Sequence, residues 1–474
     1  MRKYLTILLI LLPLLLNAGT YYVATTGSDA AAGSLAAPWA TWQKGFSTII
    51  AGDTLYIRGG TYQPIGTSIG TIFTTEWWGC VGLYNHNGTA LNRIVVMNYP
   101  GEIPILDGVN NTAANNGRGG SRFGIVMRHC DYWTFKGLNV TGVVQLTGEL
   151  GVAGFRMQEN SDHNEIIECN VYGMGGSGIS LMYDCTDNLI YNCDVYDNED
   201  PLSTPTPGNN SDGIEIADIT DTAMVNTIRG VRMWGNSDDG VDLMRNEGKV
   251  IIDSCWAFYN GLLAGKVANG FKLGWAEDPP VIEYNRVVTN CMAAYNTSTG
   301  FNANNCMQKM QIYNNLSIGN DNDGFWWYIF GARGGASIFR NNISILNDGY
   351  QYSYIYLDTY TFDHNNWDAL YDQTGPVASV EDFVTLDTLG LRYSRKANGS
   401  LPDINFAKLR STSDLIDAGI DVEIAYTGIY PDLGLFEYVV EEIDEEDFPR
   451  VTAIGTGTGN NLLVDKNGRV IIIQ

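Results

Sequence analysis

The sequence predicts an all-β fold: a right-handed parallel β-helix with an N-terminal helical cap and a C-terminal closing segment. Two repeats and the composition support this prediction. The first repeat is a Gly followed by a bulky apolar residue, a variable residue and usually another apolar residue. It recurs at intervals of about 24 to 35 residues, starting at Gly178, Gly213, Gly240, Gly270, Gly300 and, more weakly, Gly324. This period fits one coil of a β-solenoid with variable loops.

The second repeat is a short apolar alternation that ends in Asn. It ends at Asn198, Asn236, Asn260, Asn296, Asn320 and Asn347. Asn tolerates left-handed turns and its amide can bond along a stack, so we expect an asparagine ladder. Cys193, Cys255 and Cys291 share one position of this repeat, with Cys169 as a fourth member. Small buried thiols and disulfides are both compatible with this column.

The composition favours extended structure and limits the possible partners. The chain has 474 residues, of which 45% are hydrophobic, only 17% are charged and 54 are Gly. These proportions suit strands joined by tight turns better than helix bundles. Asp and Glu exceed Lys and Arg by 53 to 28, which gives a net charge of −25. We therefore expect no nucleic-acid partner, and an anionic ligand would need a bound cation or a local basic patch.

The N-terminus has the pattern of a secretory signal peptide. Arg2 and Lys3 precede an apolar run at 5–16, and small residues follow at 17–19. The alternative is a membrane anchor, but the run is shorter than the roughly 20 residues that a spanning helix needs. We expect a secreted protein, extracellular or periplasmic, that is monomeric and not associated with a membrane in its mature form.

The two ends of the solenoid are expected to be covered, because an open end would expose the core. At the N-terminal end, 21–23 and 54–58 alternate as strands, and 38–50 predicts a short amphipathic helix. The predicted organisation is a signal peptide at 1–18, a cap and first coil at 19–62, a β-helix at 63–370 whose coils at 205–305 carry the candidate site, a closing segment at 371–438, and an acidic linker with a short hairpin-like appendage at 439–474.

Carboxylates gather in two neighbouring coils. The residue two places after each repeat Gly is expected to point outward, because its neighbours are apolar. Adjacent coils lie about 4.8 Å apart, so Asp212, Asp238, Asp239 and Asp242 should converge on one patch. Four such charges repel one another unless a cation is bound, and Ca²⁺ accepts irregular oxygen sites. The alternative is a group of turn aspartates without an ion.

Lys272 occupies the same outward column as Asp242, one coil further on. A salt bridge to Asp242 is the simple interpretation. The functional interpretation is a general base, since a neighbouring divalent cation would lower the pKa of the lysine.

At these residues the sequence resembles the family 9 polysaccharide lyases, the pectate lyase type. The matching strings are NSDG at 210–213, NSDDGVDL at 236–243, SCWAFYNG at 254–261 and NGFKLG at 269–274, together with YYVATTGSD at 21–29 and GDTLYIRGGTY at 52–62. The resemblance runs from about 21 to 438. It implies that Asp212, Asp238, Asp239 and Asp242 hold a catalytic Ca²⁺ and that Lys272 is the Brønsted base.

Four further residues are candidates for substrate binding: Arg245, Arg232, Glu215 and Asn302. Arg245 is favoured because it follows Asp242 by three residues, although a solvated role is equally compatible. Glu215 adds a carboxylate beside Asp212, where the resemblance predicts a small or neutral residue. Glu215 is therefore interpreted either as an extra metal ligand or as a solvated side chain. Asn302 stands where relatives often have Asp.

The resemblance implies β-elimination of polygalacturonate, an acidic plant-type polysaccharide, with rhamnogalacturonan I as the alternative substrate. Two other classes stay open at this point. A hydrolase would use carboxylates as acid and base, but none of the four histidines lies in the Gly-His-Gly string of pectin hydrolases. A non-catalytic carbohydrate-binding β-helix would have no need for a lone lysine beside an acidic patch.

Overall fold

The structure is a computed structural model, and it describes residues 18–72, 75–111, 121–146, 151–261, 267–275, 285–306, 308–327, 337–354, 361–368, 376–439, 461–464 and 470–473. Residues 1–17 of the predicted signal peptide and residues 440–450 of the predicted acidic linker lie outside the described residues.

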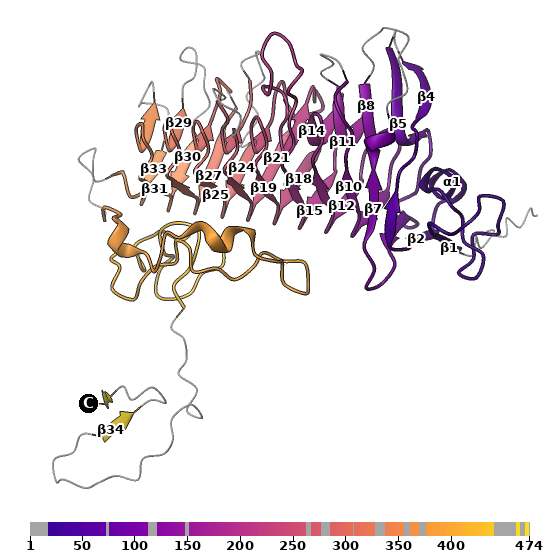
Figure 1. Cartoon of the computed structure of the whole chain (residues 1–474). Helices are drawn as coiled ribbons and strands as arrows, with labels where there is room; N and C mark the ends of the chain where they lie inside the picture. Colours follow the sequence, from indigo (N-terminus) through magenta and orange to yellow (C-terminus); the bar gives the residue numbers. More distant parts are fainter. Residues whose placement is uncertain are drawn as a thin grey trace, which may run out of the picture.

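Three long sheets run side by side along one axis, and the chain visits each sheet once per coil (Figure 1). Neighbouring strands pair in parallel throughout, except for β4 and β5. Parallel stacking of this kind is a β-helix, so the predicted fold class is confirmed. The coils succeed one another in chain order from the N-terminal end to the C-terminal end (Figure 1).

The first sheet has 12 strands within the described residues. They are β1 (Thr20–Val23), β2 (Thr54–Ile57), β6 (Ile94–Asn98), β9 (Trp133–Lys136), β12 (Glu165–Ile167), β15 (Leu189–Tyr191), β18 (Val225–Arg229), β21 (Lys249–Asp253), β24 (Arg286–Thr289), β27 (Met310–Tyr313), β30 (Ile338–Arg340) and β33 (Thr361–Asp363).

The second sheet has 10 described strands. They are β3 (Gly60–Tyr62), β7 (Pro104–Asp107), β10 (Asn139–Thr141), β13 (Asn170–Tyr172), β16 (Asp194–Tyr196), β19 (Arg232–Trp234), β22 (Trp256–Phe258), β25 (Met292–Ala294), β28 (Leu316–Ile318) and β31 (Ile343–Ile345).

The third sheet carries the candidate site and has 11 strands in the described chain. These strands are β4 (Thr67–Ile72), β5 (Thr75–Tyr84), β8 (Ser121–Arg128), β11 (Val152–Gln158), β14 (Ser177–Met182), β17 (Ile214–Ala217), β20 (Val241–Asp242), β23 (Phe271–Lys272), β26 (Phe301–Asn302), β29 (Phe325–Trp327) and β32 (Tyr352–Tyr354).

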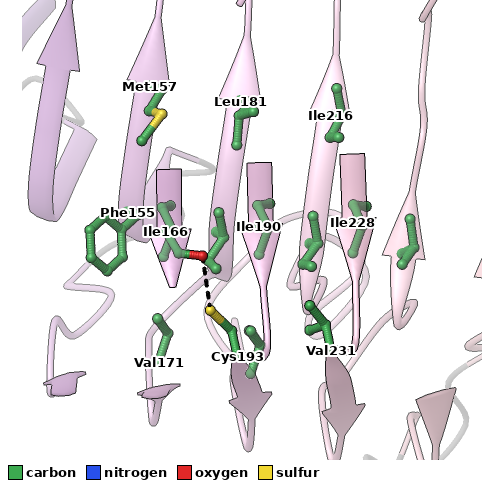
Figure 2. Packing of buried hydrophobic residues seen from close by; sticks show 14 of the residues in the cluster. Phe155, Met157, Ile166, Val171, Leu181, Ile190, Cys193, Ile216, Ile228 and Val231 are labelled. Carbon is green, nitrogen blue, oxygen red and sulfur yellow. Dashed lines mark hydrogen bonds between the residues drawn. The ribbon is translucent and has the colours of Figure 1, made fainter. Parts of the chain in front are cut away.

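The interior consists of columns of like apolar residues, because parallel register places equivalent positions of successive coils over one another. Ile166, Ile190 and Ile228 form one such column, and Leu181 and Ile216 are partners in another (Figure 2).

The cysteine column is also present. All eight cysteines are buried and free, so the thiol interpretation is confirmed over disulfides. Cys193 donates its thiol proton to the carbonyl of Ile166 (Figure 2).

The predicted asparagine ladder is confirmed. From Asn198 to Asn347, the side-chain amide of each ladder residue donates to the side-chain oxygen of the next, at 2.8 to 2.9 Å. Each oxygen also accepts from the backbone N–H of the preceding ladder residue. The ladder thereby satisfies buried turn groups that have no strand partner.

The N-terminal end of the solenoid is covered by one short helix, α1 (Trp42–Thr48), within the expected range 38–50. The Thr41 side chain caps it by accepting from the backbone of Lys44. Phe46 enters the interior and stacks on Trp133 and Phe135, with ring centroids 5.9 Å apart in both pairs. The helix therefore closes the core with large aromatic side chains.

The C-terminal segment lies elsewhere than expected. Residues 376–439, with short 3-10 helices at Val380–Asp382 and Thr388–Arg392, run along the outer face of the 10-stranded sheet instead of across the end of the solenoid (Figure 1). Phe383, Leu391 and Phe406 pack there in one cluster with Trp256 and Phe258. The outer side chains of that sheet are apolar in these coils, and the C-terminal segment buries them.

Two smaller features complete the described chain. The appendage contains an antiparallel pair, β34 (Asn461–Val464) and β35 (Val470–Ile473). A short 3-10 helix, Gly108–Asn110, follows β7. Among the helices that the structure describes, none is long and apolar enough to cross a membrane.

Candidate active site

The outward column predicted from the glycine repeat exists in the third sheet. Ser180, Glu215, Asp242, Lys272 and Asn302 are successive backbone partners on β14, β17, β20, β23 and β26. Their sequence neighbours point inward and fill the core. These five polar side chains therefore line one face over five neighbouring coils.

The repeat glycines allow these coils to stack closely. A Cβ atom at Gly240 would lie 2.5 Å from the carbonyl oxygen of Gly270, and one at Gly213 would lie 2.6 Å from that of Gly240. Real Cβ atoms do not approach backbone oxygens so closely, so glycine is required at both positions. This close stacking brings the residues just before each glycine, Asp212 and Asp239, together.

Three of the four predicted metal ligands form one buried group. Carboxylate oxygens of Asp212, Asp238 and Asp239 all lie within 4.8 Å of one another. Asp212 Oδ1 accepts from the backbone N–H of Asp239 at 3.1 Å. Asp239 Oδ1 accepts from both the backbone and the side-chain N–H of Asn269, at 2.6 and 2.7 Å. The fourth, Asp242, is buried beside this group and pairs with Lys272.

The donor set fits a hard divalent cation. All its atoms are oxygens, and Ca²⁺ takes oxygen ligands in irregular geometry. Two buried oxygens, Asp242 Oδ1 and Asp239 Oδ2, accept no hydrogen bond from the residues that the structure describes, although the second lies 3.0 Å from the Lys272 ammonium. Buried carboxylate oxygens are normally satisfied. Asp212, Asp238, Asp239 and Asp242 are therefore suited to hold such an ion.

The four aspartates repel one another when ionised, and a bound cation would offset this repulsion. Burial, followed by the charges of neighbouring aspartates, raises the pKa of Asp212 and of Asp238 well above the ordinary value. Burial also raises the pKa of Asp242, to about 6, although Lys272 acts in the opposite direction. The folded chain thus holds these carboxylates together at a cost that grows as they ionise.

Lys272 lies between two of these carboxylates. Its Nζ atom is 2.8 Å from Asp242 Oδ2 and 3.0 Å from Asp239 Oδ2. Burial alone would lower the pKa of Lys272, but the surrounding carboxylates, Asp239 first, raise it above its ordinary value. Without a cation, Lys272 is therefore a firmly protonated ammonium that cannot accept a proton.

The candidate substrate residues occupy different places. Arg245 forms a two-bond ion pair with Asp218, with Nη2 3.0 Å from Oδ2, and its side chain stays 41% exposed. Asn302 is buried; it donates to Asn269 Oδ1 and accepts from the backbone of Asn304. The amide of Asn302 therefore supports Asn269, which in turn holds Asp239.

Of the two interpretations that the sequence left open for Glu215, the solvated side chain is wrong. Glu215 lies outside the three-carboxylate group and is not freely solvated. Ser180 donates to its Oε2 at 2.5 Å, and Arg156 donates to Ser180 at 2.6 Å. Arg156 also lies 3.6 Å from Glu215 Oε2, so this pair neutralises the carboxylate next to Asp242 in the outward column.

The structure contradicts the expectation for Arg232. It lies on β19 of the 10-stranded sheet, is only 3% exposed and forms two bonds to Asp194. Its Nη1 donates to the carbonyls of Leu391 and Tyr393 in the C-terminal segment. Arg232 therefore fastens that segment to the solenoid and does not reach the candidate site.

Sequence reasoning missed two supporting residues. Asn269 occupies the same pre-glycine position as Asp212 and Asp239, and this shared position was a usable signal. Asp200 is buried and accepts from Ser237 and Asn210, which lie one residue before Asp238 and two residues before Asp212, both candidate ligands. Nothing in the repeat pattern marks Asp200, because it lies in a loop outside the stacked columns.

Comparison with known proteins gives independent evidence of the family to which the chain belongs. A family model described as "Pel9A-like, right handed beta helix region" matches residues 21–352. Pectate lyase L of Dickeya chrysanthemi is 30% identical over 440 residues, covering 88% of this chain and 90% of that protein. Pectate lyase PEL9 of Emericella nidulans is 28% identical over 419 residues, covering 82% of this chain and 92% of that protein.

Two solved structures are similar over most of the chain. The crystal structure of pectate lyase Pel9A has a TM-score of 0.69 and 28% identity, covering 88% of this chain and 96% of its own. A structure titled rhamnogalacturonan lyase also has a TM-score of 0.69, with 27% identity, covering 83% of this chain and 97% of its own. The structural similarity therefore extends over more than four fifths of the chain.

Proposed function

Because this chain belongs to the Pel9A-like right-handed β-helix family and is a polysaccharide lyase, we propose that it cleaves polygalacturonate by β-elimination in a Ca²⁺-dependent reaction. Lys272 is the Brønsted base in this proposal. The observation that carries it is the position of the Lys272 Nζ atom, 2.8 and 3.0 Å from two carboxylates of a buried oxygen-only group.

The chemistry follows from the acidity of the substrate. In a galacturonate unit, the proton on C5 lies next to a carboxylate and is weakly acidic. Lys272 Nζ accepts this proton, the C5–H electron pair forms a C4=C5 double bond, and the C4–O4 bond breaks. The leaving oxygen takes a proton from solvent, no water is consumed, and a 4,5-unsaturated sugar remains at the new non-reducing end.

The cation has three functions in this proposal. When bound to Asp212, Asp238, Asp239 and Asp242, Ca²⁺ would withdraw charge from a substrate carboxylate and offset the mutual repulsion of the ligands. Lys272 needs that offset, because the four carboxylates otherwise keep it protonated. The ion also allows a chain of net charge −25 to bind an acidic polymer.

Rhamnogalacturonan I is the second candidate substrate. The structure titled rhamnogalacturonan lyase matches this chain as closely in TM-score, 0.69, as the pectate lyase structure does. The relatives named pectate lyase in two organisms favour polygalacturonate. The same base and the same cation serve both polymers, because both contain galacturonate.

The experiment supplies the purified chain with polygalacturonate or with rhamnogalacturonan I, each with Ca²⁺ or with a chelator. Ultraviolet absorbance follows the new conjugated double bond, and a parallel assay counts reducing ends. We expect absorbance to rise on polygalacturonate with Ca²⁺, faster than on rhamnogalacturonan I, and not in chelator. Reducing ends without absorbance would indicate hydrolysis, and unchanged rates in chelator would refute the role of the cation.

We also propose that the protein is exported. The support is the basic pair Arg2 and Lys3 followed by the apolar run at 5–16. Sequencing the N-terminus of the protein released by its native cells tests this, with a start near residue 19 as the expected result. A mature chain that retains Met1 would refute the proposal.

A further inference from the structure

Arg286 is a charged side chain at an interior position of the solenoid. It is the first residue of β24, and its backbone partners in the adjacent coils are Val250 and Met310, both fully buried. Arg286 itself has 0% exposure. Placing a guanidinium at such a position is costly unless all its donors are satisfied.

The partners of this guanidinium are backbone carbonyls. Nε donates to Leu273 at 3.1 Å, Nη1 donates to Gly248 at 2.7 Å, and Nη2 donates to Asn246. No carboxylate of the described residues lies within ion-pair distance of Arg286. Arg286 is therefore not half of a buried salt bridge; it is a bridge between two stretches of backbone.

These two stretches are the ones that follow the proposed base and a proposed ligand. Leu273 comes directly after Lys272, and 246–248 belong to the turn that follows Asp242. The strands there, β20 and β23, have only two residues each, whereas β14 has six. The sheet hydrogen bonds end just where Lys272 and Asp242 must be held, and Arg286 supplies the next three bonds.

We infer that Arg286 is a positioning residue, which holds the backbone of Lys272 in register with that of Asp242 so that the Nζ atom, as a neutral amine, meets the C5 proton of a uronate. This inference rests on the proposed function of Lys272. It assigns Arg286 no contact with substrate or cation. Displacement of a reacting group by about 1 Å costs on the order of 100-fold in rate, so the register of a two-residue strand matters.

Arg93 offers a matched control. It is a partly buried arginine that spans two coils, donating to the carbonyls of Trp133 and His163, both at 2.7 Å, and it also lies 3.5 Å from Glu165. These coils precede the site by several turns of the solenoid. Arg93→Lys and Arg286→Lys therefore both remove arginine bonds to backbone carbonyls of other coils, and only the bonds of Arg286 reach the backbone next to Lys272.

The experiment measures kcat, KM and the thermal midpoint of both variants on polygalacturonate with saturating Ca²⁺. We expect Arg286→Lys to lower kcat by about 100-fold with KM within about three-fold of wild type. Arg93→Lys should keep kcat within about two-fold. In a Lys272→Ala background, Arg286→Lys should cause no further loss, because residues that act through one group are not additive.

A readout independent of activity is amide hydrogen exchange at 243–248 and 271–275. The amides of Leu243 and Leu273 are bonded across these coils, to Lys272 and Asn302, and should exchange at least about ten-fold faster in Arg286→Lys. Unchanged exchange with unchanged kcat would overturn the inference, as would equal kcat losses in both arginine variants. Should Arg286→Lys not fold, Arg286→Gln replaces it; failure of both while Arg93→Lys folds would assign Arg286 to folding alone.

The outcomes separate this inference from the proposed function. A wild-type chain that makes no unsaturated product, or a Lys272→Ala variant that keeps full activity, refutes the proposed function. An active wild type, an inactive Lys272→Ala and a fully active Arg286→Lys refute the inference about Arg286 alone.

Discussion

Lys272 and Asp242 are joined at two levels. Their backbones are partners in register between β23 and β20, and their side chains meet with Nζ 2.8 Å from Oδ2. A simple salt bridge needs only the second contact. Here the same column continues through Glu215 and Asn302, and the pair borders three further buried carboxylates. The pair is thus part of a cluster of charged groups, and a bound cation would change the net charge of that cluster.

Asp238 provides the first prediction. Asp238→Asn removes one negative ligand from the buried group, so Ca²⁺ should bind at least 10- to 100-fold more weakly, as even the loss of an outer-shell partner costs that much. Calorimetric titration with Ca²⁺ measures this without substrate. Asp221→Asn, at an exposed turn, is the control and should bind as wild type does. Equal affinities in all three proteins would contradict the assigned ligand.

The second prediction concerns stability and pH in chelator. The pKa of Asp242 in the folded chain, about 6, lies above its ordinary value of 3.8, and those of Asp212 and Asp238 are shifted in the same direction. Their contribution to stability is therefore present below pH 3.8 and is lost as pH rises through about 6. The raised pKa of Lys272 has no effect in this window, because the lysine is protonated throughout it in both states.

Thermal melting of wild type and Asp212→Asn between pH 4 and pH 8 measures this effect. Without Ca²⁺, the wild type should lose a few degrees relative to the variant across that window. Saturating Ca²⁺ should reverse the difference. A constant offset between the two proteins at every pH would refute the repulsion among the carboxylates.

The asparagine ladder provides the third prediction. Asn260 accepts from the amide of Asn236 and donates to Asn296, both at 2.9 Å, with no exposed surface. Asn260→Ala leaves buried partners unsatisfied, so the free energy of unfolding should fall by about 2–3 kcal/mol. Asn398→Ala, in an exposed turn, should change it by less than about 0.5 kcal/mol. Denaturant titration compares the two, and equal effects would contradict the role of the ladder.

Arg232 provides the fourth prediction, which follows from its corrected position. Arg232→Met breaks a buried pair with Asp194 and the bonds to the C-terminal segment, so stability should fall by about 3 kcal/mol. KM for polygalacturonate should stay within about two-fold of wild type. A large rise in KM without a loss of stability would restore the original expectation of substrate contact.

The features that the sequence could reveal are those repeated along the axis. Parallel stacking places equivalent residues one coil apart, so the glycine and asparagine positions, and with them the column from Ser180 to Asn302, are visible as a period. Pairings across the repeat are not visible. Glu215 meets Arg156 through Ser180, and Arg232 meets a segment about 160 residues further along the chain. No period relates these partners, so their charges alone could not reveal which ones meet.

The same reasoning explains the C-terminal segment and Arg286. A segment that lies on the outside of a sheet needs apolar outward positions, and Trp256 and Phe258 provide them in strands whose inward position, Ala257, is small. In the sequence this alternation resembles that of any other strand. Arg286 resembles a solvated basic residue at a strand end until its three carbonyl partners are known.

The most direct test of the central claim is the turnover of Lys272 variants on polygalacturonate with saturating Ca²⁺, followed by absorbance of the unsaturated product. Lys272→Ala should reduce turnover by several orders of magnitude, and Lys272→Arg should not restore it, because arginine stays protonated. Lys136→Ala is the control, because Lys136 lies on β9 of the 12-stranded sheet, is partly exposed and pairs with Glu168. This variant should keep turnover within about two-fold of wild type. Full turnover in Lys272→Ala would contradict the account.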